Sequence, residues 1–110
     1  MVERYANLID TLILFLLPEK ELNTDYHFLI QNRLSEIEGD YYTFLHENNL
    51  AILNSEGLIT QDNAKKIKQV RSMVLGIEKE LWTPQSFVNN IKWQSVRNLV
   101  KEILNSIEID

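Results

Sequence analysis

A sharply two-faced stretch from Ala64 to Leu81 constrains the fold more than any other feature of the sequence. Apolar residues recur there at steps of three and four, which places them on one stripe of an α-helix. The residues of this stripe are Ala64, Ile67, Val70, Val74, Ile77 and Leu81. Polar and charged side chains fill most other positions, so the stripe must pack against other apolar surfaces. The pattern predicts a helix that Thr60 caps and that reaches about Trp82.

The N-terminal apolar run predicts a buried first helix. Helical spacing extends from about Val2 to Leu17, and Pro18 ends it, because proline lacks an amide hydrogen and disfavours helical geometry in the residue before it. The strongly apolar part begins only at Leu8, whereas a bilayer span needs about 20 residues. No secretory signal is readable. We therefore expect a chain that starts at Met1, stays in the cytoplasm and does not contact a membrane.

A second run of helical spacing covers about residues 24–54, with Asn23 or Thr24 as its cap. Gly39 interrupts this run, at a cost of about 1 kcal/mol if it lies inside a helix. Two interpretations remain. In the first, one long helix bends at Gly39, and the unbroken spacing from Ile37 to Tyr41 favours it. In the second, two helices meet there with Asp40 as a new cap.

Start and stop signals divide the C-terminal half. Gly57 is placed to take a left-handed conformation after a helix end. Thr83 and Pro84 form a helix start, a capping hydroxyl followed by proline. The weak helix formers Asn89 and Asn90 predict a break before a final amphipathic helix. No stretch alternates apolar and polar residues as a strand would.

Size and composition fit one all-α domain. The chain has 110 residues, of which 45% are hydrophobic, enough for a single core without a disulfide or metal. Cysteine is absent, which excludes disulfides and thiolate metal sites. The net charge of −5 argues against binding to nucleic acid and suits equally a basic partner or plain solubility. We predict a compact bundle of four to six helices with short loops over residues 1–110.

No set of residues points to catalysis. His27 and His46 are the only histidines, and the zinc-protease motif that His46 would begin fails because position 50 is Leu50. In the one-helix interpretation the two histidines lie about 28 Å apart, too far to share a metal. Neither a nucleophile elbow nor a phosphate-binding loop is present. We expect a protein that is not an enzyme and uses no metal and no cofactor.

The densest acidic stretch is the candidate binding site. A solvated helix face is the simpler interpretation. The functional interpretation is a docking surface, because crowded carboxylates repel one another and a cationic partner turns that repulsion into attraction. Tyr42, rotated by about 100° from an inward Tyr41, should be exposed, as a binding hot spot requires. The candidate partner-binding residues are Glu36, Glu38, Asp40, Tyr42 and Glu47.

Two other groups have structural interpretations. The basic patch of the central helix is expected to pair with the protein's own acidic face or to be solvated. Trp82 and Trp93 are expected to be buried anchors of the last helices, with a ligand pocket as the alternative. The basic patch consists of Lys65, Lys66, Lys68 and Arg71.

Two segments carry a resemblance to a protein family. They are Glu80-Leu81-Trp82-Thr83-Pro84-Gln85-Ser86-Phe87, followed by Trp93 and Arg97, and Glu38-Gly39-Asp40-Tyr41-Tyr42. In style they resemble the small helical immunity proteins of bacterial toxin systems. That resemblance implies an acidic cytoplasmic protein that binds one cognate toxin domain, often a cationic nuclease, and assigns no role to a particular residue.

Two hypotheses for the function follow. The first is an immunity protein that neutralises a basic toxin domain through the acidic stretch. The second is a structural or regulatory helical protein that self-associates through the broad apolar face of the first helix. A monomer or a homodimer is compatible with the sequence.

Overall fold

The computed structural model describes residues 2–19 and 25–108, and in this part of the chain it contains six α-helices, one 3-10 helix and no strand. The all-α bundle predicted from the sequence is confirmed. None of the described helices is long and apolar enough to cross a membrane. The elements are α1 (Val2–Ile13), α2 (Tyr26–Phe44), α3 (Glu47–Ser55), α4 (Gln61–Leu75), the 3-10 helix η1 (Lys79–Leu81), α5 (Pro84–Asn89) and α6 (Ile91–Glu108).

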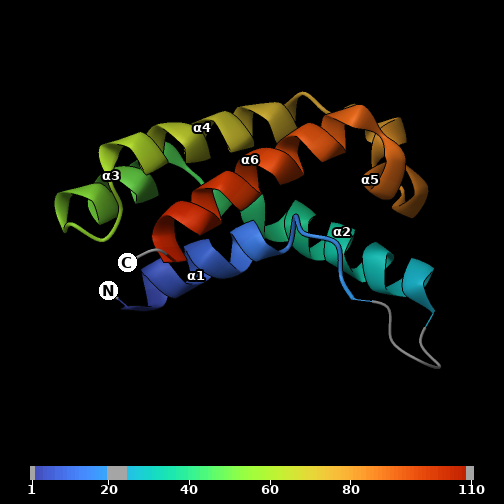
Figure 1. Cartoon of the computed structure of the whole chain (residues 1–110), viewed down its shortest axis with the longest axis horizontal. Coiled ribbons are helices and arrows are strands. Elements are labelled where there is room, and N and C mark those ends of the chain that lie inside the picture. Colours follow the sequence, from blue (N-terminus) through green and yellow to red (C-terminus); the bar gives the residue numbers. More distant parts are fainter. Residues whose placement is uncertain (1, 20–24, 109–110) are drawn as a thin grey trace.

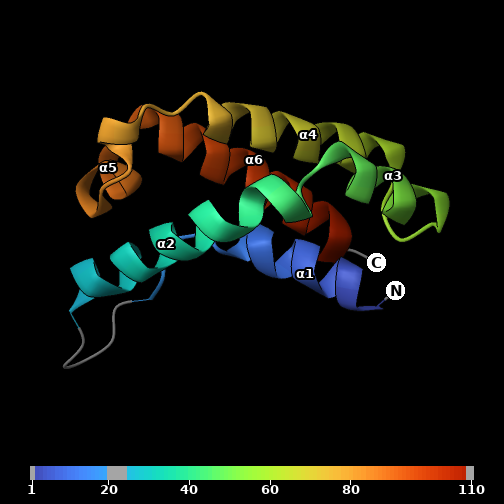
Figure 2. The same cartoon turned by 180° about the vertical axis from the view of Figure 1, so that it is seen from behind.

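Helix α6 runs through the middle of the bundle, with α4 along one side and α1 and α2 on the other (Figures 1 and 2). Its most extensive pairing is with α4, which lies antiparallel to it. The apolar stripe of α4 is buried in this pairing, and burying each large aliphatic side chain contributes about 1.5–3 kcal/mol. Helix α4 therefore forms one side of the hydrophobic core.

Helix α4 is shorter than its apolar stripe. Thr60 caps it as predicted, its hydroxyl accepting from the Asn63 amide at 3.0 Å. The helix ends at Leu75 instead of near Trp82, and the Gly76 amide closes the last turn on carbonyls of α4. Ile77 is still buried, so the stripe continues into a non-helical segment. Periodicity alone could not locate this end.

The first helix also ends earlier than predicted, at Ile13 and not at Leu17. Two arginines explain the difference. Arg33 Nη1 donates to the carbonyls of Ile13 at 3.0 Å and Leu16 at 2.7 Å, and Arg97 Nε donates to the Phe15 carbonyl at 3.0 Å. Carbonyls at the end of α1 and just after it thus accept from side chains of other helices instead of from a further helical turn.

Both interpretations of residues 24–54 are wrong about the break. Gly39 lies inside α2, and the chain breaks at Leu45 and His46. Leu45 is fully buried, and His46 begins α3 by accepting from the Asn48 amide at its Nδ1, 3.1 Å away. The predicted single long helix does not form, and Asp40 is not a cap.

The start of α2 differs in its cap as well. Asp25 is the N-cap, and its carboxylate accepts from the His27 amide at 3.0 Å. The predicted caps Asn23 and Thr24 lie outside the described residues.

The turn signals of the C-terminal half are confirmed. Gly57 has a φ of 76°. The Thr83 hydroxyl accepts from the Ser86 amide at 3.2 Å at the start of α5, and Pro84 occupies its first turn. Helix α5 ends at Asn89, and the Asn90 side chain accepts from the Lys92 amide at 2.9 Å at the start of α6.

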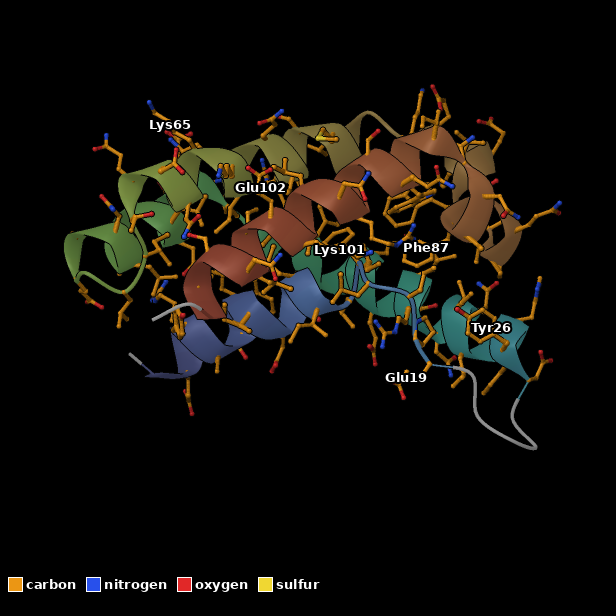
Figure 3. The ribbon with its side chains drawn as sticks, viewed as in Figure 1. Glu19, Tyr26, Lys65, Phe87, Lys101 and Glu102 are labelled. Carbon is orange, nitrogen blue, oxygen red and sulfur yellow. The ribbon has the colours of Figure 1, made fainter. Side chains whose placement is uncertain are left out.

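Arg97 of α6 joins three parts of the bundle. It is only 4% exposed, and its guanidinium donates to the carbonyls of Phe15, after α1, and of Phe87 in α5, at 3.0 and 2.6 Å. The guanidinium carbon also lies 4.6 Å from the centre of the Phe87 ring. Figure 3 labels Phe87 on α5. Burial lowers the pKa of Arg97, and Tyr26 acts in the opposite direction. Backbone carbonyls and a ring face thus stabilise this charge.

We expect Arg97→Met to lower the free energy of unfolding by about 3 kcal/mol, because two buried carbonyls lose their donor while the volume is kept. Urea denaturation followed by circular dichroism measures the change. The exposed Lys101→Met in the same helix is the control and should stay within about 0.5 kcal/mol of the wild type. Equal stability of Arg97→Met and the wild type would show that these bonds contribute nothing net.

Gly39, inside α2, and Gly57, in the turn after α3, should respond in opposite directions to substitution by alanine. A Cβ at Gly39 meets nothing within 4 Å, so Gly39→Ala should raise the free energy of unfolding by up to about 1 kcal/mol. Gly57 has a positive φ that an L side chain strains, so Gly57→Ala should lower it by about 1 kcal/mol. Thermal melts of both variants test this, and the same sign for both would contradict it.

Candidate functional site

A continuous series of aromatic rings leads from the core to the surface. Trp93 of α6 is buried, at 1% exposure, and meets Trp82 edge to face with ring centres 5.1 Å apart. Trp82 lies 6.0 Å from Tyr41 of α2, and Tyr41 meets Tyr42 edge to face at 6.4 Å. Tyr42, at the outer end, is 56% exposed. We call these four residues the aromatic series.

A surface hollow of about 520 Å³ lies beside the aromatic series, between α2 and η1. The rings of Tyr41, Tyr42 and Trp82 line it, with the charged side chains of Glu38 and Lys79. Neither charged side chain forms an ion pair within residues 2–19 and 25–108. The hollow therefore presents three π faces and one carboxylate whose oxygens accept from no protein donor in that part of the chain. We call it the aromatic hollow.

The wall formed by η1 is held by both tryptophans. Trp82 Nε1 donates to the Ile77 carbonyl at 3.2 Å, and Trp93 Nε1 donates to the Leu81 carbonyl at 2.7 Å. An ion pair between Glu78 and Lys92 ties the start of η1 to α6. These contacts fix the Trp82 ring before any ligand arrives.

A second hollow, of about 540 Å³, lies on the other side of Tyr42, between the start of α1 and the junction of α2 with α3. Most of the residues that line it are polar or charged, and the buried Asn49 organises it. Asn49 accepts from Arg4 Nη1 at 2.8 Å and donates to the Phe44 carbonyl at 2.7 Å. Tyr42 lines both hollows and forms the ridge between them.

Arg71 of α4 already binds one face of this ridge. Its guanidinium carbon lies 4.2 Å from the centre of the Tyr42 ring, and its Nε donates to the Tyr42 carbonyl at 3.2 Å. Cation–π contact and hydrogen bonding thus act together here. Tyr42 as a whole residue is still 56% exposed.

The structure divides the four candidate binding residues of α2 into two pairs. Each residue advances the helix by about 100°, so Glu38 and Tyr42 lie one turn apart on one side of the buried stripe that contains Ile37. Glu36 and Asp40 lie one turn apart on the other side. The predicted acidic face is therefore two flanks, and only the flank of Glu38 and Tyr42 lines the aromatic hollow.

Glu47, the fifth candidate, lies away from this hollow at the start of α3. Its carboxylate is 3.9 Å from Lys68 Nζ of α4, and both side chains are exposed, so the pair adds at most about 1 kcal/mol. The structure does not bring Glu47 together with Glu38 in either hollow beside Tyr42.

The basic patch of α4 pairs largely within the protein, as the sequence analysis expected. Lys68 meets Glu47, and Lys66 meets Asp62 at 3.3 Å and Glu102 of α6 at 3.1 Å. These two carboxylates, Glu102 first, raise the pKa of Lys66. Figure 3 shows Glu102 on the side of α6 that faces α4.

The tryptophan interpretation holds for one residue of the two. Trp93 is the buried anchor that was expected, but Trp82 is only partly buried and forms part of the hollow. The pocket alternative considered for the tryptophans applies to Trp82, and Lys79 is the lining residue that sequence reasoning missed, since its position depends on where α4 ends. The predicted difference in exposure between the adjacent tyrosines is confirmed, because Tyr41 is partly buried and Tyr42 is exposed.

The groups that line the aromatic hollow suit noncovalent contacts. Within the described residues no group of three or more His, Asp or Glu side chains is arranged to hold a metal ion. The aromatic hollow instead offers polarisable ring faces, a hydrogen-bond acceptor and an ammonium donor. These groups suit a ligand with an apolar stem and a polar head.

We expect the Glu78–Lys92 pair to make the η1 wall sensitive to acid. The hydrogen bond from Lys92, and then one from the Glu78 backbone, lower the pKa of the Glu78 carboxyl. A lowered folded-state pKa gives a stabilisation that is present above the ordinary carboxyl pKa and lost as the pH falls through the folded value. NMR titration should show the pKa of Glu78 returning toward its ordinary value in Lys92→Gln. An unchanged pKa would contradict the pairing.

No known protein family, curated protein or solved structure was found to match this chain.

Proposed function

We propose that this protein is a non-enzymatic binding protein of the cytoplasm that neutralises a basic toxin domain, as small helical immunity proteins do. The observation that carries the proposal is the grouping of exposed Tyr42, the aromatic hollow and Glu38, which forms no ion pair within the described residues, on one side of α2. Tyrosine and tryptophan that are fixed yet accessible are the residues that dominate binding energy at protein interfaces.

The rigidity of this surface supports a binding role. Hydrogen bonds hold the Trp82 indole and the loop around it, and Arg71 holds the Tyr42 ring. A surface ordered before binding loses little conformational entropy when a partner docks. The structural contacts therefore favour recognition of a shape that is already complementary.

Charge supports a cationic partner. The chain carries a net charge of −5, and the carboxylates of Glu36, Glu38 and Asp40 form no ion pair within the described residues. Their field accelerates the approach of a basic domain, and this effect weakens with salt. Glu47 has its own lysine and contributes less.

The self-association hypothesis loses the observation that suggested it. Leu8, Leu12 and Phe15 of the first apolar segment are buried in the protein's own core. Only Ile13 and Leu17 of that segment are large hydrophobic residues with substantial exposure, at 41% and 39%. Two scattered apolar side chains are ordinary on a protein surface.

The experiment begins with the gene next to the one that encodes this chain. Its product, expressed alone in a bacterial host, should arrest growth, and co-expression of this chain should restore it. If the product is harmless, or if this chain neither binds it nor restores growth, the proposal is refuted.

We expect the double variant Glu38→Lys/Asp40→Lys to weaken binding to that product about 10- to 100-fold, and Tyr42→Ala about 10-fold, in isothermal titration calorimetry. Their thermal midpoints should stay within a few degrees of the wild type, since these side chains lie outside the core. Glu56→Lys, an exposed carboxylate at the end of α3, is the matched control and should bind normally. Unchanged binding by the first two variants would move the binding surface elsewhere.

A further inference from the structure

We infer that the aromatic hollow is a receptor for one arginine side chain of the basic partner. This inference rests on the proposed function, because it names the partner side chain that the same surface takes. Its guanidinium would lie against the rings of Trp82 and Tyr41 and donate to the Glu38 carboxylate.

The composition of the hollow selects a guanidinium. A planar cation gains from an aromatic face through the ring quadrupole, and tryptophan provides the strongest such face. Its forked donors also match a carboxylate in a bidentate arrangement. The hollow holds both elements, and no protein cation within the described residues pairs with Glu38.

The protein itself shows this chemistry one ring away. Arg71 stacks on Tyr42 with its guanidinium carbon 4.2 Å from the ring centre and donates to a carbonyl of the same residue. Arg97 lies over Phe87 at 4.6 Å and donates to the Phe87 carbonyl. Guanidinium groups therefore already bind aromatic residues of this bundle by a ring face and an oxygen together. The aromatic hollow offers the same combination to a cation from outside.

Lys79 opposes the inferred ligand. Among the described residues it is the one ammonium that lines the hollow, and its charge repels a guanidinium. This gives the inference an unusual consequence, because removing Lys79 should improve binding whereas removing Glu38 should weaken it. A hollow that merely collects apolar or polar side chains would not show opposite signs.

The test titrates the intact protein with N-acetyl-arginine methylamide and follows the indole resonances of Trp82 and Trp93 by NMR. We expect saturable shifts at Trp82 with a millimolar Kd. The neutral citrulline analogue, which keeps the shape and lacks the charge, should give no saturable shift. Equal binding of the two compounds overturns the inference, and so does the absence of any shift at Trp82.

Variants sharpen the test without touching the core. Glu38→Gln should weaken binding of the arginine compound about three- to tenfold, and Lys79→Met should tighten it about threefold. Glu36→Gln, on the other flank of α2, is the matched control and should leave the Kd unchanged. Loss of binding in Glu36→Gln equal to that in Glu38→Gln would overturn the inference, since it would indicate attraction to the whole helix and not to the hollow.

The two proposals fail in different ways. If the arginine compound does not bind but the partner still binds through Glu38, Asp40 and Tyr42, this inference is wrong and the proposed function stands. If the compound binds with the expected signs at Glu38 and Lys79 while no basic partner exists, the hollow is a guanidinium receptor and the proposed function is wrong.

Discussion

The bundle depends on arginine side chains that donate to backbone carbonyls across helices. Arg97 and Arg33 together bind the carbonyls of Ile13, Phe15 and Leu16, where α1 ends, and Arg97 also binds Phe87 in α5. A buried guanidinium needs several acceptors to offset its desolvation, and carbonyls at a helix end are acceptors that lack intrahelical partners. Each group thus satisfies the other, and the positions of α1, α5 and α6 are fixed by the same charge.

This arrangement also places the candidate site. Because α5 and α6 are held, Trp93 of α6 is buried in the core, and its indole Nε1 donates to the Leu81 carbonyl. That bond positions η1, and η1 carries Trp82 and Lys79 to the side of α2 where Glu38 and Tyr42 lie. A surface formed by residues 40 positions apart in the sequence is therefore an outcome of core packing.

The sequence was sufficient for the fold class and for the helix starts that Thr60 and Thr83 cap, but not for the Asp25 cap of α2. It was insufficient where tertiary contacts decide. Periodicity carried α4 past Gly76 because Ile77 is buried outside the helix, and it ran through Leu45 because that buried residue keeps the helical phase. Of the candidate site, Glu38 and Tyr42 could be found from composition and phase. Trp82 had a pocket only as its alternative interpretation, and Lys79 could not be found, since the places of both depend on the turn after α4.

The residues that line the aromatic hollow differ in how easily they can be substituted. The rings of Tyr41 and Trp82 are tied to the interior by ring contacts and an indole hydrogen bond, so changing them disturbs the bundle. Its two charged side chains, Glu38 and Lys79, stand at the rim and hold nothing in place within the described chain. Sequence drift can therefore invert or erase the charge of the rim at little cost in stability. A scaffold of this kind can acquire a new specificity by one or two substitutions while its architecture is retained.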